Sequence, residues 1–130
     1  MTIYYDSKTG NVERFIEKIR SATHWRCIKI SDSLLINEYG HLVTYTTKIG
    51  SVSDSTTKFM DKHSPFILSV SSSGNMNWGD NFARAADKIT TRYNIPTLIK
   101  FELSGLERDV NRFIQKVKEH ADKKMDTPQQ

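Results

Sequence analysis

The sequence predicts an α/β domain built on a doubly wound parallel sheet of five strands, with helices on both faces. Short runs rich in β-branched and aromatic residues alternate with segments whose apolar residues recur at helical spacing. The run "PFILSVSSS" at 65–73 is nearly continuous in apolar and small residues, as expected for a strand covered on both faces. Strands that alternate with helices favour a parallel sheet, and 130 residues suit one domain.

The expected elements follow one another without a long gap. The second predicted strand, "HWRCIKI", alternates between polar and apolar residues, and the other strands are runs rich in apolar, β-branched or aromatic residues. The helices carry apolar residues at spacings of three and four. Strands are predicted at 2–5, 24–30, 41–47, 65–73 and 97–103. Helices are predicted from Asn11 past Ile19, over 53–62, over 79–93, and from Ser104 to 123, where Ser104 and Glu107 have capping-box spacing.

The chain is expected to form one domain over 1–123, followed by a disordered tail at 124–130 that has little to bury. Hydrophobic residues make up 37% and charged residues 26%, as in ordinary globular proteins. A lone cysteine, Cys27, excludes a disulfide within the chain and is expected to serve packing. We find no signal peptide and no apolar run of about 18 residues, so a cytoplasmic protein without a membrane span is expected.

The chain is mildly basic, with 19 Lys and Arg against 15 Asp and Glu and a net charge of +4. The excess is shared between the two halves and forms no tail or cluster. It is compatible with an ordinary solvated surface and with a surface that docks on an acidic partner. Nucleic acid binding is not expected, because no basic helix face or aromatic stacking platform is present.

Three loops of unusual composition follow the predicted first, third and fourth strands. They are "DSKTGN", "YTTKIGS" and "SSSGNMNWG". In a doubly wound sheet, ligands bind outside the carboxyl ends of the strands where the strand order reverses. These loops are therefore the candidate site.

The first loop has the composition of a phosphate site. Ser7 and Thr9 offer hydroxyl groups, Gly10 permits a tight turn, and Asn11 stands where a helix begins. Free N–H groups at a helix start attract an anion, so a phosphate monoester fits. The loop matches neither the Walker A pattern nor G-x-G-x-x-G. A polar turn that caps a helix is the plainer alternative.

The other two loops offer walls for a flat ligand. The second places Thr46, Thr47 and Ser51 around Gly50, and the third carries Trp78 after a glycine and an asparagine. An indole covers one face of an aromatic ligand well, although Trp78 folded onto the core is the alternative. Together the three loops favour a site for a phosphorylated planar ring such as flavin mononucleotide (FMN).

Four motifs resemble one family over residues 2–118. "DSKTGNV", "LVTYTT", "SGNMNWGDNFARAADKI" and "KFELSG" look like the NrdI family, the flavodoxin-like stimulatory proteins of class Ib ribonucleotide reductase. The resemblance implies a flavodoxin-like sheet of order 2-1-3-4-5 and FMN bound non-covalently. It also implies that reduced FMN reacts with O2 and supplies a superoxide-level oxidant to the dimanganese site of the reductase's small subunit, where a tyrosyl radical forms.

The resemblance assigns roles residue by residue. The phosphate would be held by Ser7, Lys8, Thr9, Gly10, Asn11 and Val12. One side of the flavin ring would be lined by Tyr45, Thr46, Thr47 and Gly50, and the other by Ser73, Gly74, Asn75, Trp78 and Gly79. The carbonyl of Gly50 is a candidate to face the flavin N5 and to flip when that nitrogen gains a proton.

No catalytic acid–base pair and no metal site are expected in this chain. Its four histidines, His24, His41, His63 and His120, are scattered without a metal-ligand pattern. The flavin carries the chemistry and the protein supplies position and electrostatics. We therefore expect a redox accessory protein rather than a stand-alone enzyme, recharged by a flavin or flavodoxin reductase.

Two features depart from related sequences. Ile49 stands where an aromatic residue is common, which leaves one ring face more open. The chain is basic, whereas electron-transfer flavodoxins are usually acidic. We expect few carboxylates near the ring, with Asp80 capping the helix that follows, and two one-electron potentials that lie close together.

Three other functions compete with this prediction. A short-chain electron-transfer flavodoxin shares the fold, but the basic charge and "NMNWGDNFA" argue against it. A response-regulator receiver needs an aspartate after the third strand, where this chain has "TYTT". A flavin-free binding domain would keep only the fold.

Overall fold

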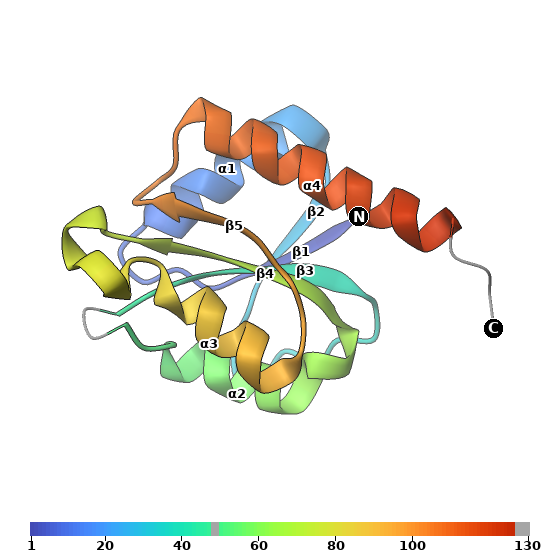
Figure 1. Ribbon diagram of the computed structural model, residues 1–130. Coiled ribbons are helices and arrows are strands. Elements are labelled where there is room, and N and C mark those ends of the chain that lie inside the picture. Colours follow the sequence, from blue (N-terminus) through green and yellow to red (C-terminus); the bar gives the residue numbers. More distant parts are fainter. Residues whose placement is uncertain (48–49, 127–130) are drawn as a thin grey trace.

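In the computed structural model, which describes residues 1–47 and 50–126, five parallel strands form one sheet in the order β2-β1-β3-β4-β5 (Figure 1). The strands are β1 (Thr2–Tyr5), β2 (Arg26–Lys29), β3 (Gly40–Tyr45), β4 (Ile67–Gly74) and β5 (Thr97–Glu102). The helices are α1 (Asn11–Thr23), α2 (Asp54–His63), α3 (Arg84–Tyr93) and α4 (Glu107–Asp126), with 3-10 helices η1 (Ser64–Phe66) and η2 (Met76–Asn81). The predicted fold class and strand order are confirmed.

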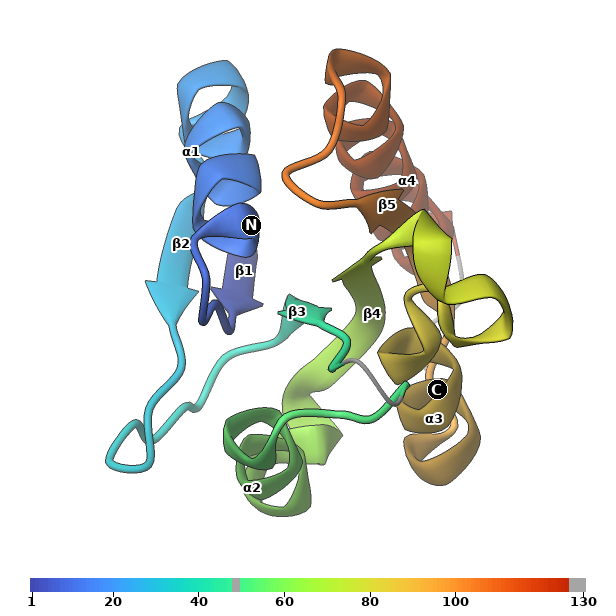
Figure 2. The same cartoon turned by 90° about the vertical axis from the view of Figure 1, so that its left-hand side faces the viewer.

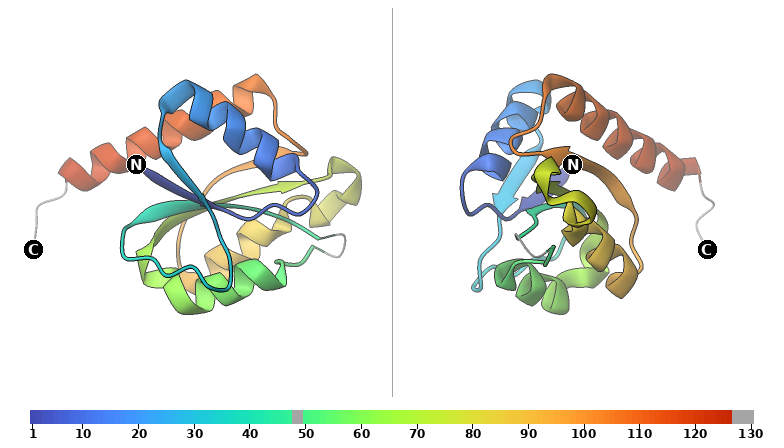
Figure 3. Two further views of the ribbon diagram at one scale, coloured as in Figure 1. Left: turned by 180° about the vertical axis from the view of Figure 1, so that it is seen from behind. Right: turned by 60° about the vertical axis from the view of Figure 1, so that its left-hand side comes forward.

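Two helical layers enclose the sheet. Helices α1 and α4 cover one face, and α2 and α3 cover the other (Figures 1 and 3). Successive side chains of β1 point to opposite layers, so Ile3 and Tyr5 join the core under α1 and α4, whereas Tyr4 joins the other. Burial on both faces of β1, β3 and β4 explains why these strands show no alternation of apolar and charged residues, whereas the edge strand β2 is partly exposed.

Three phenylalanine rings pack together within the core under α1 and α4. The rings of Phe15 and Phe101 stack at a centroid distance of 4.0 Å, and Phe113 meets Phe15 edge-on at 5.6 Å. All three side chains are almost completely buried. Because Phe15 belongs to α1, this packing fixes the helix whose first turn faces the carboxyl ends of the strands.

The prediction of a helix over 79–93 was wrong at its start. The structure has η2 over Met76–Asn81, and α3 begins only at Arg84. Asp80 lies exposed within η2 and does not cap α3. Gly79 breaks the helical geometry with a φ of 57° and a ψ of −123°, and Ala83 adopts a φ of 50° just before α3.

Hydroxyl groups of the strands cap α3 instead. The backbone N–H of Ala85 donates to Thr46 Oγ1 at 3.1 Å, and that of Ala86 donates to Ser72 Oγ at 3.2 Å. Both hydroxyl-bearing residues are buried. The free N–H groups at a helix start need acceptors, and here Ser72 of β4 and Thr46, directly after β3, provide them.

Other boundaries differ by a few residues. The second strand is shorter than predicted, and Pro65 lies in η1 before β4 begins at Ile67. Helix α4 continues to Asp126, beyond the expected end at 123. The rest of the expected tail, 127–130, and the expectation about Ile49 lie outside the described residues.

Candidate functional site

The candidate site is the edge of the sheet where the carboxyl ends of the strands meet. Figure 2 looks onto this edge, where connections after β1, β3, β4 and β5 converge. We call the segment 6–10 the phosphate loop; the ring loop is the described part of 45–53, and the tryptophan loop is 73–83. The structure places every predicted site residue in one of these loops or in the first turn of α1.

The phosphate loop leads into α1 with its backbone donors free. Gly10 precedes the helix with a φ of 97°, and no side chain caps the helix at this position. The N–H groups of residues 8–12 have no acceptor among the described residues. Ser7 Oγ accepts only the N–H of Glu13, at 3.1 Å. Such a helix start provides several N–H donors for an anion.

The predicted phosphate residues do not all contribute side chains. Lys8 and Thr9 are exposed, so their side chains are available to a ligand. The side chain of Val12 is completely buried in the core under α1. Val12 can therefore contribute only its backbone N–H.

Arg14 is a residue of this site that the sequence analysis missed. A Cβ built on Gly10 would lie 2.8 Å from a terminal nitrogen of Arg14, so the guanidinium lies directly against the loop. Arg14 donates to Asn11 Oδ1 at 2.6 Å and to Ser104 Oγ at 2.9 Å. The signal was available, because residues three and four apart on a helix are neighbours.

The predicted capping box between Ser104 and Glu107 was wrong. Ser104 donates its hydroxyl to Asn11 Oδ1 at 3.0 Å, and the N–H of Leu106 donates to the carboxylate of Asp109 at 2.8 Å. Asp109 therefore satisfies the start of α4. Ser104 joins the cluster beside the phosphate loop instead.

The ring loop is a tight turn closed by its own backbone. The N–H of Thr47 donates to the carbonyl of Ser51 at 3.0 Å, and that of Gly50 donates to the carbonyl of Thr47 at 2.9 Å. Gly50 has a φ of 73°, which glycine tolerates best. Tyr45 is half-buried at the end of β3. The hydroxyl of Thr46 is buried and serves α3, so it is engaged within the fold.

Carboxylates lie nearer to this loop than the sequence analysis expected. Burial raises the pKa of the Tyr45 phenol, and the negative charges of Asp6 and Asp54 raise it further, whereas the neighbouring Ser53 hydroxyl opposes the shift. Two carboxylates therefore lie close to Tyr45, one of the residues predicted to line the ring.

The tryptophan loop is packed tightly at its start. Ser73 donates its hydroxyl to the carbonyl of Leu103 at 2.6 Å. A Cβ on Gly74 would lie 2.4 Å from the backbone nitrogen of Ala83, so only glycine fits there. Asn75 Oδ1 accepts the N–H of Asn77 at 2.9 Å and starts η2.

Trp78 presents part of its indole at this edge. The residue is half-buried and its backbone N–H donates to the carbonyl of Asn75 at 3.0 Å, whereas its indole makes no hydrogen bond or ring contact within the described residues. Gly79 is exposed, and a Cβ there would meet nothing within 4 Å. An amphipathic ring at this edge is suited to cover a flat ligand.

The ring loop and the tryptophan loop touch each other. A Cβ on Gly50 would lie 2.7 Å from Asn81 Oδ1. The N–H of Met76 donates to the carboxylate of Glu102 at 3.0 Å, which ties η2 to the end of β5. The candidate site is thus a rim formed by three loops, and the contact between Met76 and Glu102 attaches this rim to the end of β5.

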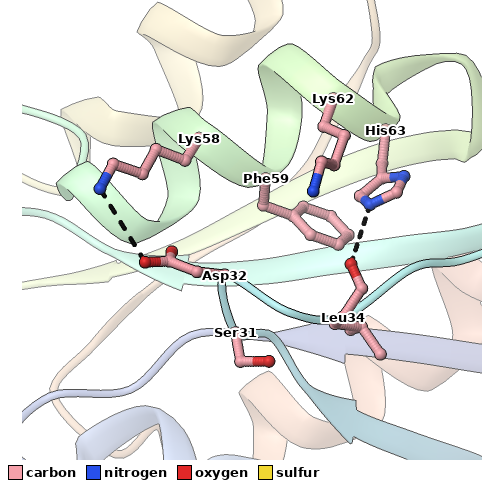
Figure 4. Close-up of a pocket in the computed structure, with 7 residues that line it drawn as sticks. All are labelled: Ser31, Asp32, Leu34, Lys58, Phe59, Lys62 and His63. Atoms are coloured by element: carbon pink, nitrogen blue, oxygen red, sulfur yellow. Dashed lines mark hydrogen bonds and ion pairs between the residues drawn. The ribbon is translucent and has the colours of Figure 1, made fainter.

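Two cavities are found outside the phosphate loop: one lies away from the rim, and the other borders its ring loop at Ser51 and Val52. One, of about 320 Å³, is shown in Figure 4 between α2 and the connection after β2, where Lys58 pairs with Asp32 at 3.9 Å and His63 Nε2 lies 3.1 Å from the carbonyl oxygen of Leu34. The other, of about 340 Å³, lies between α2 and α3 and includes Ser51. Neither contains a residue of the phosphate loop, so the candidate site is an open edge rather than one of these cavities.

The described residues were compared with the requirements of a metal site and of a membrane-spanning helix. Within 1–47 and 50–126, we find no group of three His, Cys, Asp or Glu side chains placed to hold a metal ion. In the same ranges, every helix is too short or too polar to cross a membrane.

Comparison with known proteins identifies the family. A family model described as NrdI flavodoxin-like matches residues 3–120. The chain belongs to the NrdI flavodoxin-like family. It is 45% identical to protein NrdI of Bacillus licheniformis over 115 residues, which cover 88% of this chain and 86% of that protein. It is 44% identical to protein NrdI of Macrococcus caseolyticus over 119 residues, covering 92% and 90%.

Membership in the NrdI family confirms the resemblance seen in the sequence motifs. A prophage-derived protein NrdI of Bacillus subtilis is 41% identical over 113 residues, with 87% and 88% coverage. Among solved structures, a cysteine-to-alanine mutant of a flavodoxin from Pseudomonas aeruginosa matches with a TM-score of 0.56 and 17% identity, over 93% of this chain and 97% of that one. This likeness concerns the fold alone.

Proposed function

We propose that this NrdI-family protein binds FMN non-covalently and activates the small, radical-bearing subunit of class Ib ribonucleotide reductase. Family membership supports the proposal. The single observation that carries it in the structure is the bare start of α1, where free N–H groups and the guanidinium of Arg14 converge beside the two other loops. A phosphate group needs this combination of backbone donors and positive charge.

The residues of the phosphate loop fit a phosphate monoester. The N–H groups of residues 8–12 are free to donate, and Lys8, Thr9 and Arg14 add a charge, a hydroxyl and a second charge. In this arrangement Ser7 keeps the first turn of α1 in place through the N–H of Glu13. The negative charge of the phosphate also favours the positive end of the helix.

The two other loops fit the edges and faces of a planar ring. Thr47 and Gly50 would lie on one side, and the main chain at Gly74 and Asn75 with the indole of Trp78 on the other. The hydroxyls of Thr46 and Ser73 hold the loops together and do not line the ring. When bound, FMN supplies electrons to O2, and the superoxide-level oxidant so produced would serve the dimanganese site of the partner.

In this proposal, the residues of this chain bind FMN and orient it. They hold the phosphate at the start of α1 and leave the ring edge at an open rim that a partner subunit and a flavin or flavodoxin reductase can reach. The net charge of +4 suits docking on an acidic partner. Cytoplasmic location is part of the same proposal.

A reconstitution tests the proposal directly. The FMN-loaded, reduced protein is mixed with O2 and the manganese-loaded small subunit, and the tyrosyl radical is measured by electron paramagnetic resonance. We expect radical formation that free FMN at the same concentration does not reproduce. Absence of a radical, with FMN bound and the partner active by another route, would contradict the activator role.

An electron-transfer role is the second candidate, because the flavodoxin fold is shared. The two roles differ in the partner that is bound. A pull-down with the manganese-loaded small subunit should retain this protein if it is an activator. Retention by a metabolic electron acceptor alone would favour electron transfer.

A further inference from the structure

Asp6 is a buried carboxylate at the start of the phosphate loop. Its side chain is 6% exposed, and it is the last residue before Ser7. Asp6 Oδ2 accepts hydrogen bonds from Ser53 Oγ at 2.6 Å and from Thr56 Oγ1 at 2.8 Å. Two hydroxyl donors compensate the cost of burying this group.

Because Asp6 accepts from both Ser53 and Thr56, the donor and acceptor of each neighbouring hydrogen bond are determined. Ser53 donates to Asp6, so its oxygen is free to accept the N–H of Thr56 at 3.1 Å. Thr56 also donates to Asp6, so in its 2.8 Å contact with Thr44 the donor must be Thr44. The hydroxyls of Thr44, Ser53 and Thr56 thus each donate one hydrogen bond within this network, and Asp6 is the acceptor at its end.

This network joins the phosphate loop to the ring loop. Ser53 caps α2 and stands three residues after Gly50, and Thr46 forms an antiparallel bridge with Val52. The ring loop is therefore fixed at one end by β3 and at the other by the side chain of Asp6. The main-chain N–H of Asp6 donates to the carbonyl of Val43 at 3.0 Å, so the residue is itself held by the sheet.

We propose that Asp6 is a positioning residue, which holds the ring loop in the conformation that receives the flavin ring and links this loop to the start of the phosphate loop. The inference rests on the proposed FMN function. It adds a residue that touches neither the phosphate nor the ring. Without its acceptor, Ser53 and Thr56 would release the end of the ring loop, and only a fraction of molecules would be ready to bind.

The first experiment needs no flavin. Amide hydrogen exchange is compared in the wild-type protein, Asp6→Ala and Asp6→Asn. We expect faster exchange at Thr47, Gly50 and Thr56 in Asp6→Ala, because their N–H groups lie in the ring loop and at the start of α2. Asparagine keeps an oxygen acceptor, so Asp6→Asn should exchange nearly as the wild type does.

A control variant distinguishes the loss of the Asp6 hydrogen bonds from the loss of any nearby negative charge. Asp54 is an exposed carboxylate in the first turn of α2 and makes no bond in this network. Asp54→Ala should leave exchange in the ring loop unchanged. Equal exchange in Asp6→Ala and the wild type, or equal acceleration by Asp54→Ala, would overturn the inference.

The second experiment compares FMN with riboflavin, which lacks the phosphate. Loss of the ring-loop conformation should weaken both ligands by the same factor, about tenfold in Asp6→Ala, and by less than about twofold in Asp6→Asn. Asp6→Asn should still raise the reduction potential of bound FMN, because removing a nearby negative charge favours the electron-rich form. A loss confined to FMN would assign Asp6 to the phosphate instead and would refute the proposal.

Failure of the proposed FMN function and failure of the proposed role of Asp6 give different results. If the wild-type protein binds no flavin, the proposed function fails, while the exchange experiment still tests whether Asp6 holds the ring loop. If Asp6→Ala does not fold, Ser53→Ala and Thr56→Val each remove one of the two bonds. Each should then give a smaller change of the same kind in exchange and in affinity, and no change in either would overturn the proposal.

Discussion

The hydroxyl of Ser104 donates a hydrogen bond to Asn11 Oδ1 at 3.0 Å, although 93 positions separate the two residues. Arg14 bridges the same pair, donating from Nη2 to Asn11 and from Nε to Ser104. Lys18 adds a bond to the carbonyl of Gly105 at 3.0 Å. The connection after β5 thus holds the guanidinium of Arg14 against the phosphate loop.

Arg14→Ala should weaken FMN binding about fivefold, since an exposed charge contributes about 1 kcal/mol to a phosphate. Riboflavin affinity should not change, and the difference between Arg14→Ala and wild type should shrink as salt rises. Fluorescence titration of both ligands at two salt concentrations measures this. Arg112→Ala, an exposed arginine on α4, is the control. Equal losses for FMN and riboflavin would contradict a contact between Arg14 and the phosphate.

Gly50→Val should shift the reduction potentials of bound FMN, because a side chain prevents the φ of 73° and would meet Asn81 Oδ1. The strained conformation should also cost roughly 1 to 2 kcal/mol of folding stability. Adding Asn81→Ala removes the steric part of the effect. Redox titration of both variants then isolates the backbone contribution. Unchanged potentials in Gly50→Val would remove the proposed role of its carbonyl.

The sequence predicted the sheet and the loops well, because these depend on local patterns. Apolar runs and helical spacing predicted all five strands and the order of the elements. The same patterns predicted that Trp78 and Gly50 lie at one edge. Motif resemblance then predicted the family, which the comparisons confirm.

The errors concern contacts between residues far apart in the chain. The start of α3 was misplaced because its caps, Thr46 after β3 and Ser72 in β4, lie far from it in the sequence and leave no local signal. Ser104 was assigned to a capping box because its real partner, Asn11, lies 93 positions away. Asp6 was missed as a positioning residue for the same reason. Local spacing cannot show which donor a distant acceptor will meet.

Trp78→Ala should weaken the binding of FMN and of riboflavin by the same factor, about tenfold or more. This loss is expected for an indole that stacks on the flavin ring, because stacking of an aromatic side chain on a planar ring contributes about 1 to 3 kcal/mol. Trp78→Phe should restore part of this affinity. The chain has two tryptophans, so Trp25→Phe leaves Trp78 as the only indole, and FMN should quench its emission. A small affinity loss in Trp78→Ala together with weaker binding to the partner subunit would instead assign Trp78 to the partner surface.

His41 should make folding stability depend on pH. It is 1% exposed, with Nδ1 2.6 Å from Ser69 Oγ, and burial lowers its pKa from 6.5 to about 4, with the charges of His120 and the N-terminus adding to the shift. Because the folded-state pKa is the lower one, the unfolded chain binds more protons between pH 6.5 and about 4. Stability is therefore complete above pH 6.5 and should fall by about 3 kcal/mol as pH is lowered to about 4.

His41→Asn should remove this part of the pH dependence, whatever it does to stability at neutral pH. Urea unfolding at several pH values measures the slope in each variant. Carboxyl groups contribute their own slope to both proteins, so the difference between the two curves isolates His41. His24→Asn is the control, because His24 is exposed and its φ of 63° suits asparagine. Parallel curves for wild type and His41→Asn would show that His41 does not control acid stability.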